Sequence, residues 1–180
     1  SEVVTITIDG TNDVPILAGV NTGSLVEAAD DSLIGQDGSL VGTDSNDLLV
    51  GTDGNDFLIG NSGDDTLDGG SGNDLLVGTD GNDVIDGGAG FDTADYSADD
   101  TFGGTLGVTV DVSNGSGTAI DGFGDTDTLL NIEKVIGTDQ GDTITVGISG
   151  ARAIAVGGAG DDTLSGTDGT NVVFFGGAGN

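Results

Sequence analysis

Residues 51–74 read GTDGNDFLI GNSGDDTLD GGSGND, and both glycine and aspartate return there every nine residues. The units of this array begin at Gly42, Gly51, Gly60, Gly69, Gly78 and Gly87. A strand repeats every two residues and a helix every 3.6, so neither element alone explains the pattern. A fixed period of this kind predicts that the chain winds into a stack of similar coils.

Three further positions of the unit are nearly constant. The sixth is always aspartate, at Asp47, Asp56, Asp65, Asp74, Asp83 and Asp92. The eighth is always apolar, at Leu49, Leu58, Leu67, Leu76, Ile85 and Ala94. The fourth is glycine in every unit except the first, which has Ser45. One inward-facing apolar residue in nine predicts a narrow core, which apolar burial alone cannot stabilise.

The composition restricts the function. The chain has 180 residues, with 37 glycines, 32 acidic and two basic residues, and a formal net charge of −30. A compact state with this charge repels itself unless cations enter it, and it also repels nucleic acid and anionic membranes. The chain has no cysteine and no histidine. Disulfides and thiolate sites are therefore excluded, and general-base catalysis lacks its usual residues. We do not expect an enzyme.

The pattern G-G-x-G-x-D-x-U-x, with U apolar, resembles the RTX (repeats-in-toxin) nonapeptide. The resemblance implies an all-β fold, a right-handed parallel β-roll in which two units of nine residues form one coil. Six residues of each unit turn the chain, and three form a short strand. Units of the same parity then stack about 4.8 Å apart. Asp56, Asp74 and Asp92 fall in one column, and Asp47, Asp65 and Asp83 fall in the opposite one.

The columns predict calcium sites. Stacked carboxylates repel each other unless a hard cation lies between them, and calcium takes 6–8 carboxylate and carbonyl oxygens. The resemblance implies four enclosed sites, at the pairs Asp47/Asp65, Asp65/Asp83, Asp56/Asp74 and Asp74/Asp92. Further candidate ligands are Gly42, Gly51, Gly60, Gly69, Gly78, Gly87, Asp44, Asp53 and Asp80. Solvated turn aspartates are the alternative, but strict register favours calcium. We interpret the fifth-position Asn55, Asn73 and Asn82 as turn formers.

The flanking segments are less regular. Residues 18–41 are predicted to be a lead-in and N-terminal cap, and 42–95 is the six-unit roll. Residues 96–136 interrupt the array with a strand, GVTVDVS (107–113), and worn repeats that place Asp127 and Glu133 in the ligand position. A second block, 137–180, adds Asp142 and Asp162 as ligands. Within it, 146–156 is predicted as a long turn, with Asn171 in the next sixth position. We expect the repeats to continue beyond the chain.

Residues 1–17, SEVVTITIDGTNDVPIL, differ in kind from the rest. Val4, Ile6 and Ile8 alternate with threonine, which predicts a half-buried strand. The segment resembles the end of an immunoglobulin-like or cadherin-like (VCBS-type) repeat of large bacterial surface proteins. In those families the Asn-Asp-x-Pro junction holds calcium, which adds Asn12 and Asp13 as candidate ligands. An Asx-turn is the alternative for these two residues.

Together the resemblances imply a calcium-dependent structural module of a secreted RTX adhesin, acting in cell adhesion and biofilm formation. Such a module is disordered at low calcium and folds outside a Gram-negative bacterium after type I secretion. Its expected partners are calcium, adjacent domains and the secretion machinery, with the module monomeric. The alternatives are a non-catalytic accessory module of a secreted enzyme and an ice-binding ladder at Thr43, Asn61 and Thr79. We find no apolar run long enough to span a membrane and no signal peptide.

Outward-facing apolar side chains form one predicted patch. Phe57, Ile59, Leu75 and Val77 flank the inward leucines of neighbouring coils. A contiguous apolar patch usually marks a contact. We expect the 96–136 excursion or the N-terminal strand to cover it.

Overall fold

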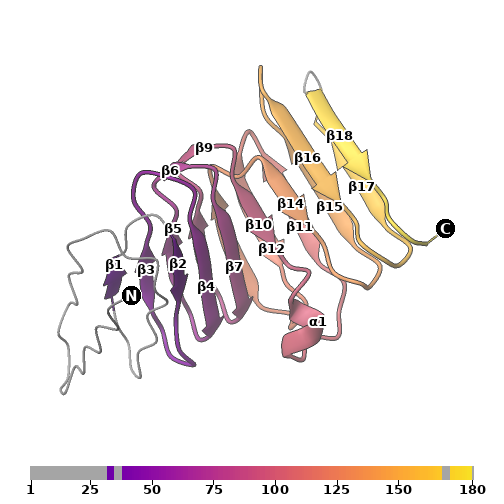
Figure 1. The fold of residues 1–180 in the computed structure, drawn as a ribbon. Helices are drawn as coiled ribbons and strands as arrows, with labels where there is room; N and C mark the ends of the chain where they lie inside the picture. Colours follow the sequence, from indigo (N-terminus) through magenta and orange to yellow (C-terminus); the bar gives the residue numbers. More distant parts are fainter. Residues whose placement is uncertain (1–31, 35–37, 168–170, 180) are drawn as a thin grey trace.

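The computed structural model describes residues 32–34, 38–167 and 171–179. They form an all-β parallel β-solenoid of about seven turns (Figure 1). Two sheets form the facing walls of the roll, and glycine-rich turns connect them. The predicted strand within residues 1–17, together with Asn12 and Asp13, lies outside the described residues.

One wall has nine strands. Their spatial order is β1 (Ser32–Ile34), β3 (Leu48–Val50), β5 (Thr66–Asp68), β8 (Val84–Asp86), β13 (Thr126–Leu130), β12 (Ser116–Ile120), β11 (Thr109–Ser113), β15 (Thr143–Gly147) and β17 (Thr163–Gly166). The other wall has seven strands. They are β2 (Ser39–Val41), β4 (Phe57–Ser62), β7 (Leu75–Asp80), β10 (Thr93–Asp95), β14 (Lys134–Ile136), β16 (Arg152–Val156) and β18 (Asn171–Phe175).

The strand register confirms the coil of two units. Leu49 pairs with Leu67 and Leu58 with Leu76, so the partners in each pair are two nonapeptides apart in the chain. All four leucines have no exposed surface and lie in one core. Each coil adds one apolar side chain from either wall, so the core is a thin column between the two sheets.

The turns stack as closely as the strands. β6 (Ser71–Gly72) pairs with β9 (Ala89–Gly90) across neighbouring turns. Gly72 has φ 141°, and a Cβ built there would lie well inside 3.0 Å of the Gly54 carbonyl oxygen. The fourth-position glycine is therefore required because the turn below leaves no room for a side chain.

The excursion inserts two strands into one wall only. β11 and β12 form an antiparallel pair, and β12 is also antiparallel to β13, whereas β11 runs parallel to β15. On the opposite wall β14 pairs directly with β16. The two walls therefore differ by two strands, and Figure 1 shows β15–β18 leaning away from the direction of β4 and β7.

Two details of the second block differ from the prediction. Residues 146–156 are not simply a turn, because β16 fills this place in the wall and Ala155 enters the core. Ala153 pairs with Val172, so Val172 rather than Asn171 takes the sixth position. Counting in nines from Gly166 failed because the last described coil is longer than two nonapeptides. The pairing of Ala153 with Val172 gives this coil 19 residues, one more than two nonapeptides.

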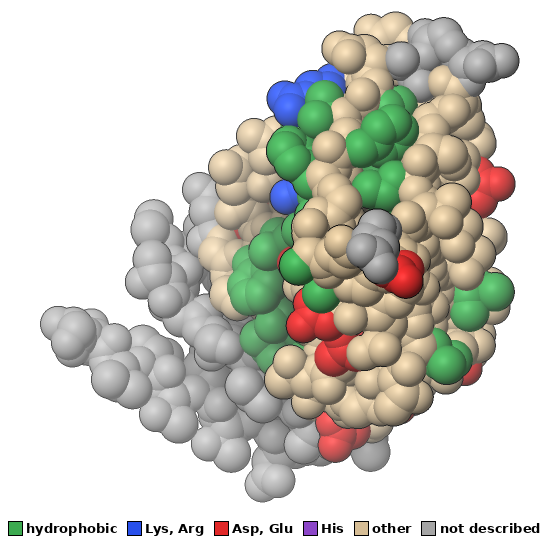
Figure 2. All heavy atoms as spheres, turned by 90° about the vertical axis from the view of Figure 1, so that its right-hand side faces the viewer, with side chains coloured by type: hydrophobic (Ala, Val, Ile, Leu, Met, Phe, Trp, Pro, Cys, Tyr) green, Lys and Arg blue, Asp and Glu red, His purple; other side chains and the backbone are tan. Residues whose placement is uncertain are grey.

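The predicted apolar patch is covered in part. The four-residue helix α1 (Asp99–Phe102), from the excursion, contacts β7. Val77 on β7 is 4% exposed, whereas Phe57 on β4 is 36% exposed. Figure 2 shows hydrophobic side chains gathered in a band along one side of the roll. In the described part of the chain, no helix has the length and hydropathy of a membrane-crossing segment.

The glycine requirement can be tested with two matched alanine variants. Gly72→Ala and Gly103→Ala both place a Cβ at positive φ, but only at Gly72 does this Cβ meet a stacked turn; Gly103 has open space around it. We expect Gly72→Ala to lower the free energy of unfolding by about 1–3 kcal/mol more than Gly103→Ala. Urea unfolding in saturating calcium measures the difference, and equal losses would contradict the stacking argument.

Candidate metal centres

Aspartates of successive turns form two ladders of hydrogen bonds. In each, the backbone N–H of one sixth-position residue donates to the carboxylate of the next turn. Beside the nine-stranded wall the ladder runs Asp47 to Asp65 (2.7 Å), Asp65 to Asp83 (2.8 Å) and Asp83 to Asp127 (2.9 Å). Beside the other wall it runs Gly38 to Asp56 (2.7 Å), then Asp56 to Asp74, Asp74 to Asp92 and Asp92 to Glu133 (2.8 Å each).

A third, shorter ladder follows the inserted strands. Val108 donates to Asp142 (2.8 Å) and Asp142 donates to Asp162 (3.1 Å). The ten carboxylates predicted from the sixth position and its worn copies thus all lie in ladders. Val108, directly before β11, takes the place of the aspartate there, and Ala153 takes it on β16, so the insertion and its neighbour interrupt the columns.

The ladder bond uses one carboxylate oxygen and leaves the other. Within the described residues, the buried Oδ2 atoms of five ladder aspartates have no hydrogen-bond partner: Asp65, Asp74, Asp83, Asp92 and Asp162. A buried polar oxygen without a partner is costly, and a charged one more so. We call these five turns open, because the Oδ2 atom of each aspartate is buried and has no partner in the described residues.

Three other turns are closed. The backbone N–H groups of Thr43, Thr52 and Thr138 donate to Oδ2 of Asp47, Asp56 and Asp142, at 2.6, 3.0 and 3.0 Å. In the open turns the second position has positive φ instead, at Asn61, Gly70, Thr79, Gly88 and Gly158. The conformation of this residue therefore decides whether the carboxylate is satisfied by the backbone or left for another partner.

Every open turn follows another aspartate turn in its ladder. Asp65, Asp74, Asp83, Asp92 and Asp162 are each preceded in their ladder by an aspartate. The closed Asp56 and Asp142 are preceded by Gly38 and Val108, which have no carboxylate. This pattern favours a shared ion between two acidic turns. It fits the four predicted pairs and adds a fifth, Asp142/Asp162.

Asp127 and Glu133 take their predicted places in the ladders, but Asp127 is not open. The Tyr96 hydroxyl donates to Asp127 Oδ2 at 2.9 Å, and both groups are buried. Burial raises the pKa of Asp127 to about 8, and repulsion from Asp83 adds to the shift. Tyr96 thus ends the first ladder with a neutral donor.

Burial also perturbs the open turns. Burial, together with repulsion from the preceding aspartate of each ladder, raises the pKa values of Asp65, Asp83 and Asp92 to about 7. The pKa of Asp74 is raised for the same reasons. At neutral pH a proton and a metal cation therefore compete for these carboxylates. A divalent ion between two of them would remove the repulsion between their charges.

The first-position glycines complete a cradle of oxygens. A Cβ on Gly69 would lie closer than 3.0 Å both to Oδ2 of Asp74, in its own open turn, and to the Gly87 carbonyl of the next turn. A side chain here would fill the space between carboxylate and carbonyl, the two oxygen types that calcium prefers. No three acidic side chains of the described residues converge on one point, so carbonyls must complete the coordination.

The remaining predicted ligands are placed differently. Asp44 and Asp53 are exposed, and Asp80 is half-buried at the end of β7, so none adds a carboxylate to a ladder. The fifth-position residues form their own ladder in the opposite direction. Asn55 accepts from the N–H of Asn73 (2.8 Å), and Asn73 accepts from Phe91 (2.9 Å), as befits turn formers.

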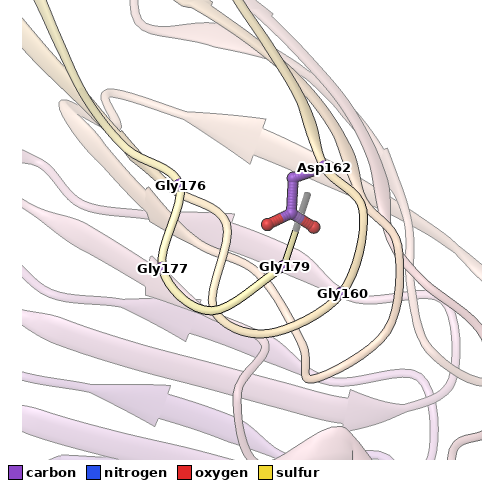
Figure 3. Close-up of a pocket in the computed structure, with 5 residues that line it drawn as sticks. All are labelled: Gly160, Asp162, Gly176, Gly177 and Gly179. Atoms are coloured by element: carbon purple, nitrogen blue, oxygen red, sulfur yellow. The ribbon is translucent and has the colours of Figure 1, made fainter.

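The last described turn shows one open site in isolation. Figure 3 shows the Asp162 carboxylate pointing into a hollow framed by Gly160, Gly176, Gly177 and Gly179. The turn at 176–179 stacks on the Asp162 turn through mutual backbone bonds of 3.0 Å between Ala178 and the residues Gly158 and Gly160. The surrounding glycines have no side chains, so the Asp162 carboxylate faces an open hollow.

A comparison with protein families matches the RTX calcium-binding nonapeptide repeat at residues 41–76, 59–94 and 153–180. The chain carries RTX repeats. Comparison with curated proteins gave no significant match. RTX repeats bind Ca²⁺ through their aspartate turns, and they are typical of extracellular bacterial proteins secreted by type I systems. The open turns supply the carboxylate and carbonyl oxygens that this ion requires.

Replacing one open-turn aspartate by its amide tests the ligand assignment. Asp74→Asn keeps an oxygen for the Asp56 N–H but replaces the partnerless Oδ2 by an amide group. We expect calcium affinity at this turn to fall about tenfold or more, equal to about 1.4 kcal/mol or more. Calorimetric titration measures it. Asp44→Asn makes the same charge change at an exposed position and should bind as the native chain does.

The raised pKa values predict opposite effects of acid with and without calcium. An unfolded aspartate has a pKa of about 4, so between about pH 4 and 7 the folded chain binds more protons than the unfolded one. In EDTA, lowering the pH from 7.5 to 5 should therefore favour folding. In millimolar calcium it should disfavour folding, because protons compete with the ion. Circular dichroism measures both, and equal signs would contradict the assignment.

Proposed function

We propose that this chain is a calcium-dependent structural and extension module of a secreted adhesin. Outside the cell, calcium folds the roll into a rigid spacer, and inside a calcium-poor cytosol the same sequence stays unfolded and fit for export. The module itself performs no chemistry, since an RTX repeat module is non-catalytic. Its role is to fold when calcium binds and then to act as a spacer of fixed length.

The observation that carries this proposal is the set of open turns. They bury carboxylates whose second oxygen has no partner in the described residues, in a chain with 32 acidic and two basic residues. The thin core adds one apolar side chain per unit, which does not offset the cost of ordering nine residues. Ions bound to the folded state alone supply stability that depends on calcium concentration.

The adhesin context rests on residues 1–17. Their alternation of valine and isoleucine with threonine, followed by Asn12-Asp13-Val14-Pro15, is similar to the end of a repeat from large bacterial surface proteins. A repeat before the roll is suited to a long adhesin stalk. Export by a type I system from a Gram-negative cell, and display at its surface, follow from the same proposal.

Circular dichroism with and without calcium tests the proposal directly. We expect the chain to show little sheet in EDTA and full sheet in millimolar calcium, with a cooperative rise between them. If each site has a Kd near 10⁻⁴ M, calcium at a hundredfold excess adds about 2.7 kcal/mol per site. Magnesium at equal concentration is the control for ionic strength. Equal sheet content in EDTA and in calcium would refute calcium-dependent folding.

A further inference from the structure

The excursion contains two buried carboxylates that do not belong to the nonapeptide pattern. Asp99 lies in α1, and Asp121 follows directly after β12. Both side chains have no exposed surface. No ladder uses them, and their spacing in the sequence follows no repeat, so the pattern that identifies the other acidic positions does not include them.

Each of the two carboxylates is half satisfied. Asp99 Oδ2 accepts the Gly122 N–H at 2.9 Å, and Asp121 Oδ1 accepts the N–H groups of Phe123 (3.0 Å), Gly124 (2.7 Å) and Asp125 (2.8 Å). Asp99 Oδ1 and Asp121 Oδ2 are buried and have no hydrogen-bond partner in the described residues. The same division into one bonded and one partnerless oxygen marks the open turns.

The two residues are close to one another. Asp99 bonds to the residue that follows Asp121, and a Cβ on Gly122 would meet the Asp99 carboxylate at 2.9 Å. Carbonyls crowd the same place, because a Cβ on Gly104 would meet the Gly122 oxygen at 3.0 Å and the Asp99 oxygen at 3.1 Å. Both carbonyls already accept two backbone N–H groups each, so the partnerless oxygens of Asp99 and Asp121 are the free ligands at this place.

The charges that raise the pKa values of this pair are acidic side chains. Burial, together with the charges of Asp121, Asp127 and Asp100, raises the pKa of Asp99 to about 7. Burial also raises the pKa of Asp121. Asp121 in turn acts on Asp83, the last open turn of its ladder. Four buried carboxylates therefore share one region, with Tyr96 donating only to Asp127.

We infer that Asp99 and Asp121 hold a further calcium ion, outside the RTX repeats, through their partnerless oxygens. No third acidic side chain of the described residues converges with them, so water molecules complete the ligand set. The ion ties α1 to the loop after β12 and so fastens the excursion to the roll. The inference rests on the proposed function in one respect: both require that the chain is exposed to calcium.

The test counts ions and uses Tyr96 as an internal probe. Tyr96 is the chain's one tyrosine and there is no tryptophan, so Tb³⁺ emission excited through tyrosine reports ions near Tyr96. In Asp99→Asn and Asp121→Asn we expect calorimetry to find one calcium ion fewer than in the native chain. We also expect tyrosine-sensitised Tb³⁺ emission to fall.

Asp162→Asn is the matched control, because it removes one open-turn carboxylate beyond the inserted strands. It should lower calcium binding and leave the Tb³⁺ emission unchanged. If either asparagine variant fails to fold, Asp99→Glu and Asp121→Glu keep the charge and change its reach. Weakened binding of one ion in them supports the inference, and unchanged binding overturns it.

The outcomes separate this site from the repeats. Asparagine variants that keep both the ion count and the Tb³⁺ emission overturn the inference, and the proposed function stands. Variants that keep the ion count but gain stability at pH 7 show that protons, not calcium, occupy the pair, and this also overturns it. A native chain that binds no calcium overturns both proposals together.

Discussion

Repulsion between stacked carboxylates is the constraint on which the rest of the structure depends. The register brings aspartates of neighbouring coils into bonding contact, as when Asp65 donates its N–H to Asp83 while its own carboxylate accepts from Asp47. This contact fixes the height of each coil and concentrates negative charge in the turns. The stacked coils are therefore stable only where cations enter the turns, and the glycines leave room for these ions.

The backbone provides two ways to treat a buried carboxylate. In a closed turn, the second residue turns its N–H to the acid, as Thr52 does for Asp56. In an open turn, positive φ at that residue leaves the oxygen for an ion. Thr52 and Thr79 occupy the same position in two identical GTDGND segments and adopt different states. Asp56 follows Gly38 in its ladder, whereas Asp83 follows Asp65, so the state of the threonine varies with the preceding turn and not with the local sequence.

The sequence predicts most of the fold because its repeat sets the length of one coil: two nonapeptides form one turn of the solenoid. The columns of Asp47 and Asp56, and the leucine core, follow from two nonapeptides per coil. Three features do not follow. The coil from Ala153 to Val172 is one residue longer than two nonapeptides, so counting in nines misplaced Asn171. Whether the second residue of a unit adopts the open or the closed conformation depends on the turn that precedes it in the stack. Asp99 and Asp121 are brought together by an antiparallel insertion, and no spacing marks them.

The unequal walls have a mechanical consequence. Two added strands lengthen one wall by about 10 Å at the spacing of neighbouring strands, while the facing wall continues without a gap. A stack of equal coils is a straight rod, so a hairpin placed in one side alone acts as a wedge and gives the rod an elbow. The positions of such hairpins along a longer roll would then determine where it bends.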